Sequence, residues 1–256
     1  MSLISLDKVF ACTSSNEVLL ILPVFNEASR ESDYFWQELV SNSHIDFVFI
    51  DDCSTDNSLD LLERYRNLPN VGLIKLRKNS GKAEAIRQAF LSESKENSNH
   101  KYVGYLDSDG AFPALEAMRH ISMAIEKFEE GHSIYTVSRV MLSGRNIKRK
   151  THRHVIGRLI RTLITFRHKS LPYDTQSGFK LFKNDSLFDQ VMAFPFRTKW
   201  FVDIEVIARG RAFSEDIVLI WEEPALAWSD IGNSSIKLRS SFRILVDIIR
   251  ILRMGK

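Results

Sequence analysis

The sequence has 256 residues, of which 44% are hydrophobic and 26% are charged, so it can bury a full core as one large α/β domain or two small ones. Its two cysteines, Cys12 and Cys53, lie far apart with no CxxC spacing, which argues against a disulfide framework or a zinc site. The formal net charge is only +3, no run of about 18 apolar residues occurs, and the first residues lack a signal-peptide pattern, so we expect a soluble or peripheral protein.

Short apolar segments alternate with segments of helical spacing through the first half of the chain. Strands are predicted over 17–25, 47–50, 71–76 and 102–106, and helices over 31–40, 58–67 and 81–92. This alternation predicts a mostly parallel sheet with helices on both faces. The loops that follow the strands should therefore gather at the carboxyl ends of the strands.

Polar and acidic loops follow three of these strands: PVFNE at 23–27, DDCSTD at 51–56 and DSD at 107–109. Asp107 and Asp109 repel each other unless a cation or a donor lies between them, although an Asx turn that ends the strand would also explain them. The convergence of three loops on one edge favours a ligand site. The absence of GxGxxG and GxxxxGK[ST] motifs argues against a dinucleotide oxidoreductase and a P-loop phosphotransferase.

The second half begins with a predicted helix over 118–130 and a strand over 133–138 that ends at Arg139. The window 139–169 holds ten Lys or Arg and no acid, leaving 25 basic against 32 acidic residues elsewhere, so a basic surface lies on an acidic body. Within it, 154–166 has the spacing of a basic amphipathic helix, as has the tail 236–256. Core packing is the commoner reason for such stripes, but they also suit an anionic membrane surface.

Six motifs in register carry a family resemblance. LILPVFNE, FIDDCSTDNS, NSGKAEAIRQAF, YLDSD, VSR and DTQSGFKLF resemble family 2 glycosyltransferases of GT-A fold. More narrowly, DTQSGFKLF, FVDIE and AWSDIGNSSIKL are similar to the polyprenyl-phosphate sugar transferases, most of all to the dolichyl-phosphate β-glucosyltransferase branch and its bacterial relatives. The resemblance implies one domain over 1–256: a nucleotide-sugar half (17–138), an acceptor half (139–235) and a basic amphipathic tail (236–256).

For the donor, the resemblance implies that Asp107 and Asp109 hold Mg²⁺ or Mn²⁺, whose hard oxygen ligands suit a diphosphate. The other residues implied for the nucleotide sugar are Pro23, Phe25, Glu27, Asp51 and Asp52 around the nucleoside, and Lys82 near the diphosphate. Asp51 and Asp52 could instead cap the helix near Ser58. Related mannosyltransferases often have Gln where this chain has Ala111, so a third metal ligand must come from elsewhere or be water.

For the acceptor, the resemblance implies that Arg139 and Arg153 bind a phosphate, with Lys180 directed to the same region. Asp174 and Asp203, with Glu205 beside them, are the carboxylates expected near the reacting centre, to orient sugar hydroxyls or act as base. The family often has Ser where this chain has Gly157. DTQSGF could also be a tight turn with Gly178 packed under the sugar site.

The activity expected from the resemblance is inverting transfer of a hexose, with UDP-glucose favoured and GDP-mannose as rival, to polyprenyl phosphate. We expect peripheral attachment to the cytoplasmic face of the membrane, and a homo-oligomer is possible. Alternatives are transfer to a sugar hydroxyl of a cell-surface polysaccharide, a silent relative that only binds nucleotide, and a nucleic-acid-binding module. The acidic body and the lack of interleaved aromatic residues argue against nucleic acid as a partner.

Overall fold

The structure is a computed structural model that describes residues 5–28, 32–96, 99–149, 157, 161–165, 171–198, 201–213, 218–231 and 246–253. Its strands are β1 (Leu6–Phe10), β2 (Val18–Val24), β3 (Asp46–Asp51), β4 (Val71–Leu76), β5 (Tyr102–Leu106), β6 (Ile134–Ser138), β7 (Asn146–Lys148), β8 (Phe179–Lys183), β9 (Ile220–Pro224) and β10 (Ala227–Ser229). Its helices are α1 (Ser32–Val40), α2 (Ser58–Leu62), the 3₁₀ turn η1 (Glu63–Tyr65), α3 (Lys82–Glu96), α4 (Ala114–Glu129), α6 (Ser186–Met192) and α7 (Val202–Phe213). The residues 246–252 are also helical.

Eight strands form one sheet in the order β1-β4-β3-β2-β5-β8-β6-β9, which takes strands from both 17–138 and 139–235. The neighbours β4-β3, β3-β2, β2-β5 and β6-β9 are parallel, whereas β1 and β8 run antiparallel to their neighbours. The mostly parallel α/β sheet is therefore confirmed. Strands β7 and β10 form a separate parallel pair.

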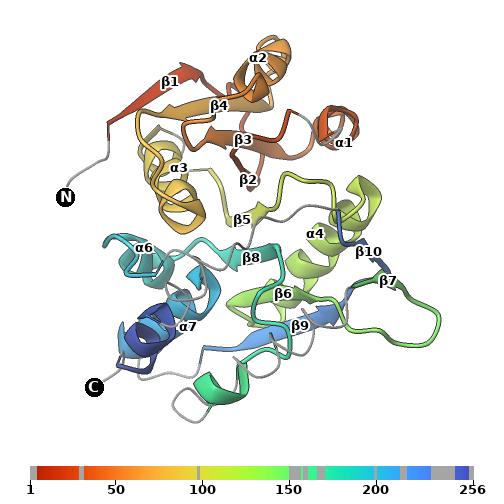
Figure 1. Ribbon diagram of the computed structural model, residues 1–256, viewed down its shortest axis with the longest axis vertical. Helices are drawn as coiled ribbons and strands as arrows, with labels where there is room; N and C mark the ends of the chain where they lie inside the picture. The colour runs from red at the N-terminus through yellow and green to blue at the C-terminus, as the bar shows by residue number, and fades with distance from the viewer. Residues whose placement is uncertain are drawn as a thin grey trace.

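Helices cover both faces of the sheet, with α1, α2 and α4 on one face and α3, α6 and α7 on the other (Figure 1). Alternate residues of each strand supply the two layers of core: Leu20 and Phe49 pack under the first set of helices, and Ile21 and Val48 under the second. Because both faces are buried, the central strands are continuous apolar runs.

Several observed elements differ from the predicted ones. The predicted helix 58–67 ends early, as α2 and then η1. Strand β1 and helix α6 were not predicted; α6 is capped by Asp185, whose side chain accepts a hydrogen bond from the Phe188 amide at 2.9 Å. Helix α4 begins directly after Pro113, four residues earlier than predicted.

The two basic amphipathic segments lie largely outside the described residues. Of 154–166 the structure describes 157 and 161–165, where Ile164 is buried and Leu163 is exposed. In the tail, Ile248 and Ile251 are buried and Leu252 packs against the core, whereas Ile249 is exposed. Within the described part of the chain, no helix has both the length and the apolar character needed to cross a bilayer.

Candidate functional site

The DSD segment leaves β5 with its middle residue turned inward. Ser108 is buried; its hydroxyl donates to the Pro23 carbonyl at 2.7 Å, and its own carbonyl accepts from Trp36 Nε1 at 2.8 Å. The flanking carboxylates of Asp107 and Asp109 are left half-buried at the carboxyl edge of the sheet. A small hydrogen-bonding residue between two acids is what this arrangement requires.

Asp107 contacts two residues that sequence motifs had singled out. Its carboxylate pairs with the Lys82 ammonium at the start of α3, and its backbone N–H donates to the Gly178 carbonyl at 2.8 Å. Burial opposes the charge on Lys82, but attraction by Asp107, Asp203 and Asp109 outweighs burial and raises the pKa of the lysine. Gly178 packs against the Asp107 carboxylate so closely that a Cβ at position 178 would overlap it.

Asp109 forms an Asx turn, since its Oδ1 accepts the Ala111 N–H at 3.1 Å. Among the described residues, no group of three or more His, Cys, Asp or Glu side chains is placed to hold a metal ion. The donor set of Asp107 and Asp109 nevertheless fits Mg²⁺ or Mn²⁺, because such ions are commonly bound by one or two carboxylates together with water and phosphate oxygens. Because Gly178 has no Cβ, the Asp107 carboxylate has room beside it at this edge.

The loops after β2 and β3 are tied together. Thr55 N–H donates to Asn26 Oδ1 at 2.8 Å, and Glu27 N–H donates to Ser58 Oγ at 2.8 Å. Asn26 and Cys53 both have a positive φ, of 56° and 64°, so each loop has a non-glycine residue in the left-handed region. Backbone held this way commonly lies at functional sites.

The residues predicted around the nucleoside lie on these two loops and at the ends of the strands that precede them. Pro23 is in β2, Phe25 is 45% exposed just beyond it, and Glu27 is buried. The Asp52 carboxylate accepts the N–H groups of Ser80 and Gly81, at 2.7 and 2.8 Å, directly before α3.

The alternative reading, in which Asp51 and Asp52 cap the helix at Ser58, is wrong. Asp51 accepts instead from the Ser54 N–H, at 3.2 Å. The Ser58 N–H is bound by Asp56, at 3.0 Å.

Of the residues predicted to bind the acceptor, Arg139 forms a tight pair with Asp174, which was predicted near the reacting centre. Asp174 accepts hydrogen bonds from Arg139 N, Nε and Nη2 at 3.0, 2.6 and 2.7 Å, and Arg139 Nη2 also donates to the Gln176 carbonyl at 2.7 Å. Burial would raise the pKa of Asp174, but Arg139 and then Arg149, 3.7 Å away, hold it well below its usual range. The guanidinium of Arg139 also lies 5.1 Å from the ring centroid of Trp228. Arg153 lies outside the described residues.

Lys180 and Asp203 are a second buried pair, with Nζ and Oδ1 3.1 Å apart. Lys180 Nζ also donates to the Ser177 carbonyl at 2.7 Å. Burial lowers the pKa of Lys180 and raises the pKa of Asp203, because it disfavours the charged form of each. Lys82 interacts with Asp203 as well as with Asp107. The Lys82–Asp107 pair and the Lys180–Asp203 pair therefore belong to one charged cluster.

Glu205 is not brought to this cluster. It lies two residues after Asp203 on α7, which places the two side chains on opposite sides of the helix. Its carboxylate accepts hydrogen bonds from the Arg197 N–H, from the Thr198 N–H and hydroxyl, and from Arg209. Glu205 therefore fixes the segment that precedes α7, and the expectation that it lies beside the reacting centre is corrected.

Two residues that the sequence analysis did not select contact Asp174 or the residue before it. Arg149 lies near Asp174, and Glu222 of β9 accepts backbone N–H groups of Tyr173 and Asp174. Arg149 belongs to the basic window, which marked the surface but not the residue. Glu222 lies within β9 and matches no motif.

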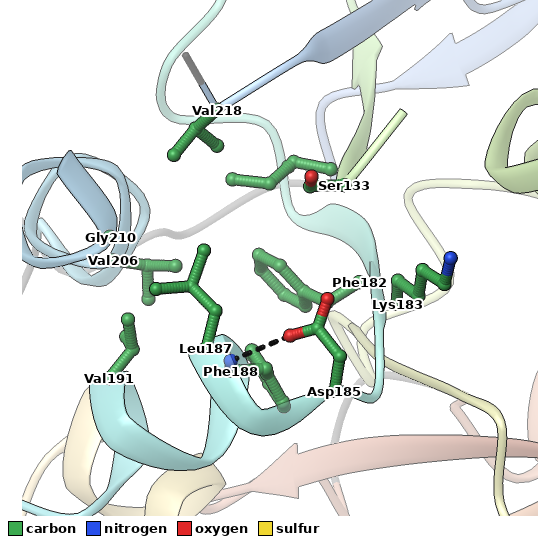
Figure 2. A pocket seen from close by; sticks show the side chains of 11 residues that line it. Ser133, Phe182, Lys183, Asp185, Leu187, Phe188, Val191, Val206, Gly210 and Val218 are labelled. Atoms are coloured by element: carbon green, nitrogen blue, oxygen red, sulfur yellow. Dashed lines mark hydrogen bonds between the residues drawn. The ribbon is translucent and has the colours of Figure 1, made fainter. Parts of the chain in front are cut away.

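A separate hollow lies between α6, α7, the end of β8 and the start of β6 (Figure 2). Phe182, Leu187, Phe188, Val191 and Val218 line it, and it measures about 20 Å³, room for about one water molecule. It is too small for a nucleotide. The candidate site is therefore the charged cluster at the edge where β5 and β6 end and β8 begins.

The model of the family described as glycosyl transferase family 2 matches residues 19–199, more than half of the chain. The chain belongs to this family. The match covers the three acidic loops, Arg139, Asp174 and Lys180.

Curated relatives of this family 2 glycosyltransferase include two dolichyl-phosphate β-glucosyltransferases. The protein ALG5C of Trichomonas vaginalis is 26% identical over 94% of this chain and 69% of its own length. The Dictyostelium discoideum protein is 28% identical over 88% of this chain and 65% of its own length. The chain thus spans about two thirds of the length of each of these relatives.

Solved structures share the fold. Glucosyl-3-phosphoglycerate synthase from Mycobacterium tuberculosis, determined with Mn²⁺, UDP and glucosyl-3-phosphoglycerate, has a TM-score of 0.66 at 12% identity, covering 94% of this chain and 81% of that one. The family 2 glycosyltransferase described here therefore has the GT-A fold, as predicted.

Proposed function

We propose that this protein transfers a hexose, glucose in preference, from a UDP-sugar to polyprenyl phosphate, with inversion, at the cytoplasmic face of a membrane. One observation carries the proposal: at a single edge of the sheet, three cations (Lys82, Lys180 and Arg139) pair with three aspartates (Asp107, Asp203 and Asp174). Such a site is suited to two phosphate-bearing reactants, one that leaves and one that attacks. The dolichyl-phosphate β-glucosyltransferases among the relatives support the acceptor class.

On the donor side, Asp107 and Asp109 would hold Mg²⁺ or Mn²⁺, which when bound neutralises charge on the leaving diphosphate. Lys82, already paired with Asp107, would add a second positive charge there. The tied loops that carry Phe25 and Asp52 would form the nucleoside pocket. UDP-glucose is favoured because the relatives include dolichyl-phosphate β-glucosyltransferases. Structural neighbours were solved with UDP and with GDP-mannose, so GDP-mannose is the rival donor.

On the acceptor side, a phosphate monoester needs no strong base near neutral pH, because it is already ionised. Arg139 and Lys180, with Arg153, would orient it, which is the larger part of what such a reaction needs. A phosphate oxygen bonds to the anomeric carbon as the bond from that carbon to the nucleotide breaks on the opposite side. The configuration at the carbon is thereby inverted.

The test is incubation of the protein with radiolabelled UDP-glucose, undecaprenyl phosphate and Mn²⁺. We expect label in the organic extract that depends on the lipid phosphate and on the metal. GDP-mannose in place of UDP-glucose separates the two donors. If no nucleotide sugar gives extractable label, the proposed function is wrong.

A second candidate is transfer to a sugar hydroxyl of a cell-surface polysaccharide. It is favoured by the raised pKa of buried Asp203, which suits a general base. Asp203→Asn distinguishes the two: a hydroxyl acceptor should lose about 10²-fold or more in kcat, whereas a phosphate acceptor should lose much less.

A further inference from the structure

Glu222 binds the backbone of a loop that it does not belong to. It lies in β9, next to Thr136 of β6 in the sheet register. One carboxylate oxygen accepts the Tyr173 N–H at 2.5 Å and the other accepts the Asp174 N–H at 2.8 Å. Two neighbouring backbone donors thus share one carboxylate, whose two oxygens each accept one N–H group.

The loop held by Glu222 in turn holds Arg139. The Asp174 side chain takes three hydrogen bonds from Arg139, through its backbone N–H, Nε and Nη2. Among the described residues no hydrogen bond involves the remaining nitrogen, Nη1. The guanidinium is therefore oriented on one side by Asp174, and its other side can serve an anion.

We propose that Glu222 is a positioning residue, which fixes Asp174 through the 173–174 backbone and thereby sets the Arg139 guanidinium for the acceptor phosphate. This inference rests on the proposed function for the identity of the acceptor. Glu222 touches neither reactant in this scheme, and it acts only through Asp174.

Glu222→Gln removes one of the two acceptor oxygens and turns an NH₂ group toward a backbone N–H. Two donors then face each other in place of a donor and an acceptor, so the 173–174 loop must shift, and Arg139 shifts with Asp174. The matched control is Glu223→Gln, the same change one residue along the strand. Glu223 points to the other face, where it accepts from Trp221 Nε1 at 3.1 Å.

The experiment measures KM for undecaprenyl phosphate, KM for the nucleotide sugar, and the NMR resonance of the Arg139 Nε–H, assigned by its loss in Arg139→Lys. In Glu222→Gln we expect the acceptor KM to rise about ten-fold or more, the donor KM to stay within about two-fold, and the Nε–H resonance to move. In Glu223→Gln all three should stay at wild-type values. A purely structural role would instead change both KM values together or neither.

The outcomes separate the two proposals. If wild type transfers nothing to lipid phosphate but the Nε–H resonance still moves only in Glu222→Gln, the proposed function fails and the positioning of Arg139 stands. An unmoved resonance overturns the positioning role, whatever the kinetics. A moved resonance with a wild-type acceptor KM overturns its link to the acceptor phosphate.

Discussion

Gly178 is the residue on which the position of Asp107 most directly depends. A Cβ at 178 would overlap the Asp107 carboxylate more closely than any Cβ contact that proteins tolerate. The atoms it would meet belong to a carboxylate held by Lys82, so the carboxylate cannot simply swing aside. The requirement for glycine in DTQSGF is therefore close packing against Asp107.

Gly178→Ala should therefore displace Asp107 and lower kcat/KM by about 10²-fold, because misplacement by about 1 Å has such effects. The Mn²⁺ concentration for half-maximal activity should rise, and stability should fall by about 1–3 kcal/mol from overpacking. Gly210→Ala is the control, since a Cβ there meets Val218 at an ordinary 3.4 Å. Wild-type metal dependence in Gly178→Ala would contradict the prediction.

At the scale of elements, helix α4 is joined to the β9–β10 turn by one buried carboxylate. Glu116 accepts the Leu226 N–H at 2.6 Å and also binds Arg119 and His120. Burial would raise the pKa of Glu116, but the hydrogen bonds from His120, Arg119 and Leu226 lower it to about 2. The turn leads directly into β10, which carries the Trp228 ring next to Arg139.

Glu116→Gln should lower the free energy of unfolding at pH 7 by about 3 kcal/mol. Because the pKa of Glu116 is lower in the folded state than its unfolded value of 4.5, its ionised carboxylate stabilises the fold above pH 4.5. This stabilisation is lost as the pH falls from there toward about 2. The difference between variant and wild type should therefore shrink below pH 4.5, as measured by denaturant unfolding across pH. Glu129→Gln, at an exposed position of the same helix, should change stability by no more than about 0.5 kcal/mol. If the difference in the free energy of unfolding between variant and wild type is constant with pH, this explanation is wrong.

The sequence predicted the central strands because buried strands consist mainly of apolar residues. The predicted strands 71–76 and 102–106 match β4 and β5. The sequence did not predict the direction of β8, because the segment FKLF is compatible with either strand direction. Its antiparallel pairing with β5 and β6 follows from chain topology. The Arg139–Asp174 contact joins residues 35 apart, so the pattern selected both residues but not their pairing. Glu222 was missed for the same reason, since its partners are backbone groups of a distant loop.

At the scale of the whole molecule, ligand binding should stabilise the folded chain through both tied loops and the DSD segment. A ligand at about 100 times its Kd adds about 2.7 kcal/mol, which for a chain of this size raises Tm by about 5–10 °C. We expect this shift with UDP-sugars only when Mn²⁺ is present, because in the proposed function Asp107 and Asp109 would hold the diphosphate through the ion. Asp109→Ala should lose the Mn²⁺-dependent part of the shift, while Asp60→Ala, at an exposed position of α2, should keep it. A larger Tm shift with GDP-sugars than with UDP-sugars would change the proposed donor. An equal Tm shift with and without Mn²⁺ would contradict a role for the metal in donor binding.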